Sequence, residues 1–269
     1  MAGTNDGGQA LRDIDVSVPH SARIWNYWLG GKDNFQADRA AGDEFLTFYP
    51  QQLDKARACR QFLARAVRYL VLEAGVRQFL DIGTGLPTAN NTHEVAQQAA
   101  PEARIVYVDN DPLVLTHARA LLTSSPEGVT SYIDADMHDP GEILAEARKT
   151  LDFDQPIALL MIGVLGHVAD YDEARSIVRR LIEGLPSGSF FVETDGTDSS
   201  PAYLAAIEHY RDSGGVPYNV RTTEQIAGFY EGLELIEPGV LPIHLWRPEL
   251  SMFGNAPDVS ESGGVGRKV

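Results

Sequence analysis

The chain has 269 residues, of which 43% are hydrophobic and 22% are charged, a balance typical of a globular protein with a sizeable core. The formal net charge of −16 disfavours a nucleic acid or an anionic membrane as the main partner, because both are polyanions. The single cysteine, Cys59, excludes an intramolecular disulfide and a cysteine-rich zinc site, and we expect it to be a buried structural thiol.

The N-terminal segment is polar, and no apolar run approaches the ~20 residues that span a bilayer. We therefore expect a cytoplasmic protein that binds neither a membrane nor a nucleic acid and is a monomer or a homodimer. Residues 1–18 are expected to be mobile. Residues 19–46 predict two short helices, the first ended by Gly30-Gly31 and the second capped by Asp33 or Asn34.

Residues 51–74 carry apolar side chains at helical spacing and are followed by Gly75, a helix stop signal. From residue 77 the period changes, and short apolar runs alternate with helical patterns. This alternation predicts βαβ units, a mostly parallel sheet and helices on both of its faces. Strands are expected within 77–85, 103–112, 129–139, 156–168 and 188–196, with helices at 113–122, 140–151 and 171–185.

The C-terminal part adds helices near 201–211 and at 223–230, the second with a capping box between Thr222 and Gln225. Residues 233–246 predict one further strand with a proline at each break, and 263–268 an edge strand. With no second domain boundary, the chain divides into a mobile N-terminus (1–18), a helical extension and lid (19–75) and an α/β core (76–269).

The run Asp81-Ile-Gly-Thr-Gly-Leu-Pro-Thr88 follows the first expected strand, at the sheet edge where ligands bind in open α/β folds. Gly83 and Gly85 permit a tight turn and a close backbone approach to a ligand. Thr88 stands where a dinucleotide-binding turn requires glycine or alanine. The carboxylate of Asp81 suits the ammonium group of S-adenosylmethionine better than a pyrophosphate. A tight connection without a ligand is the alternative.

Asp109 ends the second expected strand, where a carboxylate accepts hydrogen bonds from two ribose hydroxyls, so this residue indicates an adenosine without choosing the cofactor. Asp109-Asn110-Asp111 also resembles the Asp-x-Asp motif of glycosyltransferases, against which the upstream glycine turn argues. After the third strand, Asp136 is placed to accept from an adenine amino group and Met137 to pack on the ring. Acids and His138 at 134–139 raise the alternative of a metal, but no ligand spacing supports one.

The fourth strand ends in Gly163, which again permits a close approach to the cofactor, and is followed by His167. His167 is a candidate general base or acceptor-site residue; the alternative is a histidine bonded to a loop backbone. Glu193 and Asp195 follow the fifth strand, and they either line an acceptor pocket or are solvated loop acids.

Five stretches are similar to an actinobacterial family of class I S-adenosylmethionine-dependent methyltransferases. They are ARIWNYWLGGKDNFQADRAA, FLDIGTGLPT, VYVDNDPLVL, GLELIEPGV and GGVGRK, and the similarity runs from about residue 19 to the C-terminus. Pro87 departs from the general class I pattern, where many enzymes have a third glycine. The resemblance implies a Rossmann-like fold with a seven-stranded sheet whose last strand, 263–268, is antiparallel beside VLPIHLW. The cofactor-binding residues that we expect are Asp81, Gly83, Thr84, Gly85, Thr88, Asp109, Asn110, Asp136, Met137 and Gly163.

The aromatic segment at 23–35, RIWNYWLGGKDNF, is a candidate lid over the cofactor with Gly30-Gly31 as its hinge. The aromatic wall of this lid would come from Trp25, Tyr27, Trp28 and Phe35. Within it we expect Trp28 to be mostly core and Tyr27 and Asn34 to face the pocket. Arg23 or Lys32 is expected to meet the cofactor carboxylate.

The function that these residues favour is methyl transfer from S-adenosylmethionine to a small molecule, in specialised metabolism. The alternatives are a protein of the same fold that binds this cofactor without methyl transfer and an NAD-dependent oxidoreductase, against which Asp81 and Thr88 count.

Overall fold

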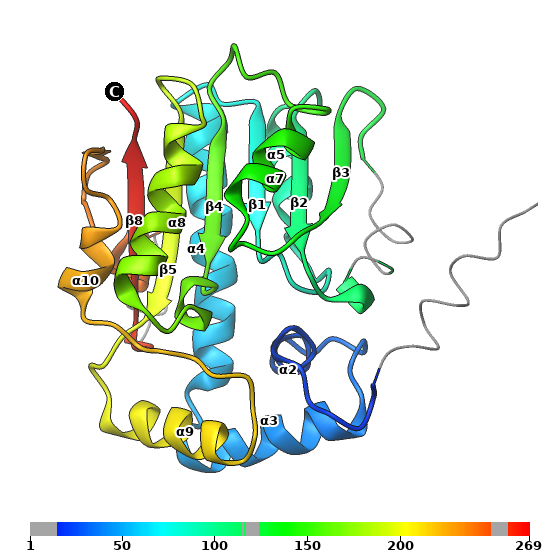
Figure 1. Ribbon diagram of the computed structural model, residues 1–269, viewed down its shortest axis with the longest axis vertical. Coiled ribbons are helices and arrows are strands. Elements are labelled where there is room, and N and C mark those ends of the chain that lie inside the picture. The colour runs from blue at the N-terminus through cyan, green and yellow to red at the C-terminus, as the bar shows by residue number, and fades with distance from the viewer. Residues whose placement is uncertain (1–14, 115, 117–123, 249–257) are drawn as a thin grey trace, which may run out of the picture.

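The computed structural model describes residues 15–114, 116, 124–248 and 258–269. Its centre is one mixed sheet in the order β3-β2-β1-β4-β5-β8-β6, with β7 also paired to β8 (Figure 1). The five strands β1 to β5 are parallel, whereas β8 runs antiparallel to its neighbours, which confirms the predicted topology. The strands are β1 Gln78–Ile82, β2 Arg104–Asp109, β3 Val129–Asp134, β4 Ala158–Ile162, β5 Phe190–Gly196, β6 Glu234–Leu235, β7 Leu241–Pro242 and β8 Glu261–Arg267.

The segment 233–246 differs from the single strand that the sequence predicts. It forms two two-residue strands, β6 and β7, followed by a 3₁₀ turn at Ile243–Leu245. Pro238 and Gly239 separate the two strands because proline cannot donate a ladder hydrogen bond and glycine favours a bend. Both short strands pair with β8, so the sheet has eight strands in place of the expected seven.

Helices cover both faces of the sheet, as the βαβ pattern predicts. Alternate β1 side chains point to opposite faces: Phe79 packs with Phe62 of α4 in one apolar cluster, and Leu80 packs with Ile177 of α8 in the other. Cys59 is buried in the first cluster, which confirms its structural role. The helices are α2 Ser21–Trp28, α3 Gln36–Phe48, α4 Gln52–Leu72, α5 Thr92–Ala99, α7 Pro140–Ala147, α8 Tyr171–Glu183, α9 Pro201–Asp212 and α10 Thr223–Gly228.

Helices α2, α3 and α9 gather at the edge where the parallel strands end (Figure 1). The prediction that Asp33 or Asn34 caps α3 is wrong. The backbone N–H of Phe35 instead donates to the Asp38 carboxylate, 2.8 Å away, while the Asn34 amide is taken up by Asn26 and the carbonyl of Gly31. The capping box of α10 is confirmed, since Thr222 and Gln225 exchange hydrogen bonds.

Two sequence predictions fall largely outside the described residues: the mobile segment at 1–18 and the helix at 113–122. Within the described part, α4 is the longest helix, and no helix is both long and apolar enough to cross a membrane.

Candidate functional site

A cavity of about 370 Å³ opens at the carboxyl edge of the sheet, between the strand ends and α2; we call it the edge cavity. All ten residues predicted to bind the cofactor line it, and His167 does so as well. The carboxyl ends of adjacent parallel strands meet at one edge, which is why residues from four separate strand ends converge there.

The turn after β1 depends on its two glycines for different reasons. Gly83 has a φ of +70°, and a Cβ on it would lie 2.3 Å from Cγ2 of Val164, so this glycine packs directly against the β4 loop. Gly85 has a φ of +64°, and no atom lies within 4 Å of the position of its missing Cβ. The space beside Gly85 is therefore part of the cradle that a ligand fills.

These environments predict different effects of alanine at the two positions. We expect Gly83→Ala to lower the free energy of unfolding by about 2–4 kcal/mol, because strain and overpacking add. Gly85→Ala is expected to cost only about 1–2 kcal/mol of stability but to weaken cofactor binding, since its methyl group enters the cradle. Urea denaturation and calorimetric titration with S-adenosylhomocysteine measure the two quantities. Equal losses of stability in the two variants would contradict this assignment.

Asp81 is the last but one residue of β1 and is 6% exposed. The hydroxyl of Thr92, at the start of α5, donates to its Oδ2 at 2.6 Å. Burial nevertheless dominates and raises the pKa of Asp81 to about 6, because one hydroxyl does not replace the lost hydration of a carboxylate. A cationic ligand group placed here would favour the ionised form.

Asp109, at the end of β2, joins the second strand to the glycine turn. Its Oδ2 accepts from the N–H of Gly85 at 2.9 Å, and its Oδ1 accepts from the N–H of Asp111 at 2.9 Å. Burial raises the pKa of Asp109, and the two backbone bonds oppose that rise. The glycine turn and the β2 carboxylate therefore form one unit.

Asp136, after β3, is exposed at the rim of the edge cavity and accepts from Asn110 Nδ2 at 3.2 Å. The ring and the backbone N–H of His138 also contact its Oδ1. Met137 beside it is half-buried. In the part of the chain that the structure describes, no group of three or more His, Cys, Asp or Glu side chains is arranged to hold a metal ion.

His167 lines the cavity, as expected of an acceptor-site residue, and it is also bonded to a loop backbone, which is the alternative. It ends a 3₁₀ turn at Leu165–His167, its Nδ1 lies 3.0 Å from the carbonyl oxygen of Pro217, and its ring meets Tyr218 edge-on. Burial lowers the pKa of His167, which favours the neutral ring. A carbonyl oxygen requires a donor, so Nδ1 carries the proton and the lone pair lies on Nε2.

Glu193 and Asp195 match neither of their expected environments. Strand β5 continues through both residues, and both are fully buried and outside the lining of the edge cavity. Asp195 pairs with Arg221 at 2.7 Å and accepts from the Tyr218 hydroxyl at 2.7 Å. Burial, followed by repulsion from Asp195, raises the pKa of Glu193. Asp195 is therefore a structural anchor for Tyr218, which lines the cavity.

Helix α2 covers the edge cavity, as expected of a lid. Of the four predicted wall aromatics, Trp25 and Trp28 line the cavity, and Tyr27 and Phe35 do not. Trp28 is half-buried, packs on Phe45 with ring centroids 5.1 Å apart and also lines the cavity. The residues of this segment that line the cavity are His20, Ser21, Ala22, Ile24, Trp25, Trp28 and Leu29.

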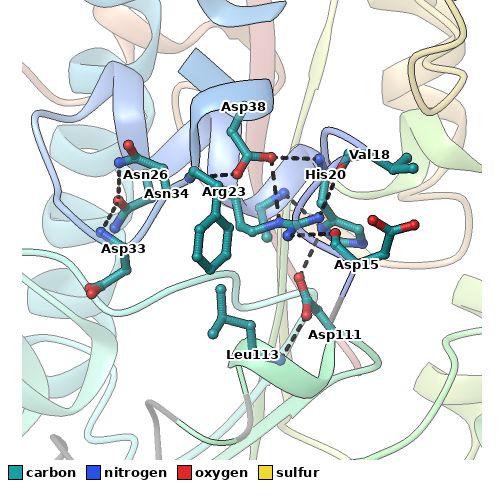
Figure 2. Close-up of polar contacts among 12 residues, drawn as sticks. Asp15, Val18, His20, Arg23, Asn26, Asp33, Asn34, Asp38, Asp111 and Leu113 are labelled. Carbon is teal, nitrogen blue, oxygen red and sulfur yellow. Dashed lines mark hydrogen bonds and ion pairs between the residues drawn. The ribbon is translucent and has the colours of Figure 1, made fainter. Parts of the chain in front are cut away.

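Arg23 does not face the cofactor side, contrary to the prediction. Its guanidinium is 5% exposed, lies 3.4 Å from Asp38 and donates to the carbonyls of Asp15 and Val18 (Figure 2). Asp38 also accepts from the backbone N–H of His20 at 2.9 Å. These contacts make Arg23 part of a clasp that joins the start of α2 to the start of α3.

The other four predicted lid residues do not line the edge cavity either, so the expectation that Tyr27 and Asn34 face the pocket is wrong. The Tyr27 hydroxyl donates to Asp43 at 2.6 Å, and Asn34 donates to Asn26 at 3.0 Å. Lys32 is exposed, and Phe35 packs on a small apolar cluster that includes Leu86, below the turn. Tyr27 lies on α2 and the other three in the connection to α3, and in both places the direction of a side chain depends on its tertiary partners.

His20 provides the contact between the lid and the cofactor edge that the sequence did not reveal. Its Nδ1 lies 2.9 Å from Oδ2 of Asp111, whose own N–H donates to Asp109 (Figure 2). Four further lining residues, also missed, come from distant parts of the chain: Lys55, Tyr203, Tyr218 and Glu261.

The strand order, the antiparallel β8 and the glycine turn at the carboxyl edge define a Rossmann-like fold of the class I methyltransferase type. The sequence matches the model of the S-adenosyl methyltransferase family over residues 7–269, and the chain belongs to that family. It is accordingly an S-adenosylmethionine-dependent methyltransferase, with S-adenosylmethionine as its cofactor.

Solved structures agree with this assignment. A DUF574 family protein from Streptomyces avermitilis is 46% identical, with a TM-score of 0.90 over 95% of this chain and 99% of its own. A candidate methyltransferase from Thermobifida fusca is 40% identical, with a TM-score of 0.85 over 94% of this chain and 96% of its own. Both organisms are actinobacteria. An O-methyltransferase family protein from Burkholderia thailandensis is 14% identical, with a TM-score of 0.52 over 97% of this chain and 66% of its own, and shows the fold alone. No curated protein matches the sequence.

The residues of the edge cavity fit S-adenosylmethionine. Asp81 and Asp109 supply carboxylates for groups that donate hydrogen bonds, and the space beside Gly85 is open. The hydroxyl of Thr88 is buried and has no hydrogen-bond partner among the described residues, which leaves it available to a ligand.

Proposed function

We propose that the protein methylates a small molecule of specialised metabolism and that the edge cavity holds both the cofactor and the acceptor. The observation that carries this proposal is the division of the cavity lining into two parts. The glycine turn and three strand ends supply polar groups at one end, and α2, α3 and α9 supply aromatic and aliphatic side chains at the other. A site with both parts suits a polar cofactor beside a largely apolar acceptor.

In this proposal Asp81 binds the ammonium group of the cofactor, Asp109 the ribose hydroxyls and Asp136 the adenine amino group, with Met137 against the ring. The motifs LGGKDNF and DIGTGLPT are then the signature of the lid and of the cofactor turn. When bound, S-adenosylmethionine supplies an electrophilic methyl carbon. The chain has to hold the acceptor in line with that carbon and exclude water. Helix α2, which covers the cavity, excludes the water. In this division of the chain, residues 19–75 form the extension and lid, and residues 76–269 form the core.

His167 is a candidate base in this scheme, because its neutral ring presents Nε2 as an acceptor while Nδ1 is held by Pro217. We place the reaction in the cytoplasm, with a protein that acts as a monomer or a homodimer. The net charge of −16 supports an acceptor other than a nucleic acid.

The test uses S-adenosylmethionine labelled in its methyl group, the purified protein and an extract of an actinobacterium from which endogenous enzymes have been removed by heat. We expect label to appear in the low-molecular-mass fraction, with a matching amount of S-adenosylhomocysteine, only when the protein is present. Label in nucleic acid or protein would contradict the small-molecule acceptor. Cofactor binding without any transferred label would favour a binding protein.

A further inference from the structure

Glu261 is a buried carboxylate in the wall of the edge cavity that no sequence motif indicates. It begins β8 and pairs in register with Gly196, the last residue of β5, so it lies at the carboxyl edge of the sheet. The residue is 2% exposed and lines the cavity. Its Oε1 lies 4.0 Å from the point where a Cβ on Gly163 would sit, which places this oxygen beside the end of β4.

Lys55 of α4 holds this carboxylate in place. Its Nζ is 3.0 Å from Oε2 of Glu261, donates to the carbonyl of Ser260 at 3.0 Å and lies 3.7 Å from the centre of the Tyr203 ring. Burial alone would lower the pKa of Lys55, but Glu261, Tyr203 and Cys59 together outweigh it and raise the pKa above its ordinary value. The Lys55 ammonium group is therefore held in place by contacts with Glu261, Ser260 and Tyr203.

Glu261 keeps unused capacity to accept hydrogen bonds. Within the described part of the chain neither of its carboxylate oxygens receives a well-aligned hydrogen bond, although the Lys55 ammonium and the Cys59 thiol lie beside it. Burying a carboxylate without hydrogen bonds costs free energy. Such a group in a native structure calls for an explanation, and a ligand that donates the missing hydrogen bond is one. Because Lys55 occupies the side of Oε2, a ligand donor has to meet Oε1, an atom that the surrounding side chains otherwise cover.

The surroundings limit what that donor belongs to. The Tyr203 ring beneath the Lys55 ammonium packs against Phe45, which also packs against Trp28 and Tyr210. These aromatic residues line the cavity together with Trp25, Ile207 and Val216. Such a wall suits a flat or aliphatic molecule. The Lys55–Glu261 pair is neutral as a unit, so an ammonium group buried beside it would remain uncompensated, whereas a neutral hydroxyl needs only one acceptor.

We propose that Glu261, in place of His167, binds and deprotonates the hydroxyl of a neutral aromatic acceptor, so that the protein acts as an O-methyltransferase, a refinement that rests on the proposed function. The acceptor oxygen forms its bond to the methyl carbon and loses its proton to the Glu261 carboxylate. The electron pair of the broken carbon–sulfur bond stays on sulfur in S-adenosylhomocysteine. Glu261 is then a catalytic residue, and Lys55 is the positioning residue that holds its carboxylate in place.

The test compares two ligands of the same shape on the full-length protein saturated with S-adenosylhomocysteine. 2-Naphthol carries the hydroxyl donor, and 2-methoxynaphthalene lacks it. We expect calorimetry to show naphthol binding about tenfold more tightly than the ether, because its hydroxyl meets a charged acceptor. In Glu261→Gln we expect that preference to fall to about threefold or less, with binding of S-adenosylhomocysteine unchanged.

Glu193→Gln is the matched control, since Glu193 is also a fully buried carboxylate on the sheet but does not line the cavity. It should keep the preference for naphthol. Should Glu261→Gln fail to fold, the double variant Lys55→Met/Glu261→Leu replaces the ion pair with apolar side chains, which proteins often tolerate, and it should abolish the preference.

Failure of the wild-type protein to bind S-adenosylhomocysteine would refute the proposed function itself. If S-adenosylhomocysteine binds, three results overturn the role of Glu261 alone: no naphthol binding, a preference that survives removal of the carboxylate, or the same loss in Glu193→Gln.

Discussion

Asp81→Asn is expected to make the free protein more stable and the cofactor complex weaker. Burial raises the pKa of Asp81 to about 6, whereas an aspartate in an unfolded chain titrates near 4. A group with a raised folded-state pKa binds its proton more tightly when folded, so its ionisation destabilises the fold as pH rises from about 4 through about 6. Above pH 7 this cost is roughly 2–3 kcal/mol at most, and asparagine removes it while still accepting from Thr92.

The same substitution removes the carboxylate that faces the cofactor ammonium in the proposed complex. We expect binding of S-adenosylhomocysteine to weaken about 10- to 100-fold at pH 8, because the variant loses the free energy of one hydrogen bond to a charged group. In the wild type the affinity should also fall as pH is lowered through about 6, because Asp81 becomes protonated, and in the variant this part of the pH dependence should vanish.

Urea denaturation at pH 5 and pH 8, with calorimetry at both pH values, measures these effects. The stability gained by the variant should be larger at pH 8 by about 1 kcal/mol. Asp134→Asn, at an exposed carboxylate that ends β3 outside the cavity lining, should change neither quantity. A variant that is less stable at pH 8, or that binds as the wild type does, would refute the role of Asp81.

Asp38→Ala is expected to release the lid without touching the cavity. The Asp38 carboxylate is fully buried, accepts from the backbone N–H groups of His20 and Phe35, and pairs with Arg23 (Figure 2). Its removal leaves a buried guanidinium without its ion pair and two N–H groups without acceptors. Loss of one partner of a buried ion pair costs about 3–5 kcal/mol, and here the cost falls on the junction of α2 and α3.

Hydrogen exchange locates this effect. Amides of α2 should lose most of their protection in Asp38→Ala, while those of β1 and β4 keep theirs, because α2 opens as a unit separate from the sheet. Binding of S-adenosylhomocysteine should weaken about tenfold, although Asp38 does not line the cavity. Asp43→Ala is the control on the same helix, since this residue is exposed and accepts from the Tyr27 hydroxyl of α2. Unchanged protection of α2 in Asp38→Ala would mean that the clasp does not hold the lid.

The cofactor half of the site follows from the sequence because local pattern and topology act together there. Each apolar run that ends in glycine or an acid defines a strand end, and a parallel sheet brings such ends to one edge. Asp81, Asp109, Asp136 and Gly163 therefore line one cavity, as expected from their positions alone. The end of β5 does not follow from the sequence, which places Glu193 and Asp195 after the strand. The strand continues through both residues. This is possible because Arg221 and Tyr218 bond to the buried Asp195 carboxylate.

The acceptor half of the site could not be predicted in the same way. The directions of Tyr27 on α2 and of Asn34 in the connection to α3 depend on their partners Asp43 and Asn26, which the local sequence pattern does not indicate. Lys55 and Glu261 are distant in sequence and meet only in the folded chain. One signal did exist: Lys55 is four residues before Cys59 on the buried stripe of α4, where a charged residue requires a partner.

Calorimetric titration of S-adenosylmethionine into the wild-type protein and into Asp109→Ala tests the central claim most directly. The carboxylate of Asp109 joins the glycine turn to the end of β2 and faces the ribose in the proposed complex. We expect one molecule of cofactor to bind each wild-type chain and the affinity to fall at least about 100-fold in the variant, because two hydrogen bonds to a charged group are lost. No binding to the wild type, or equal binding to both proteins, would contradict the account.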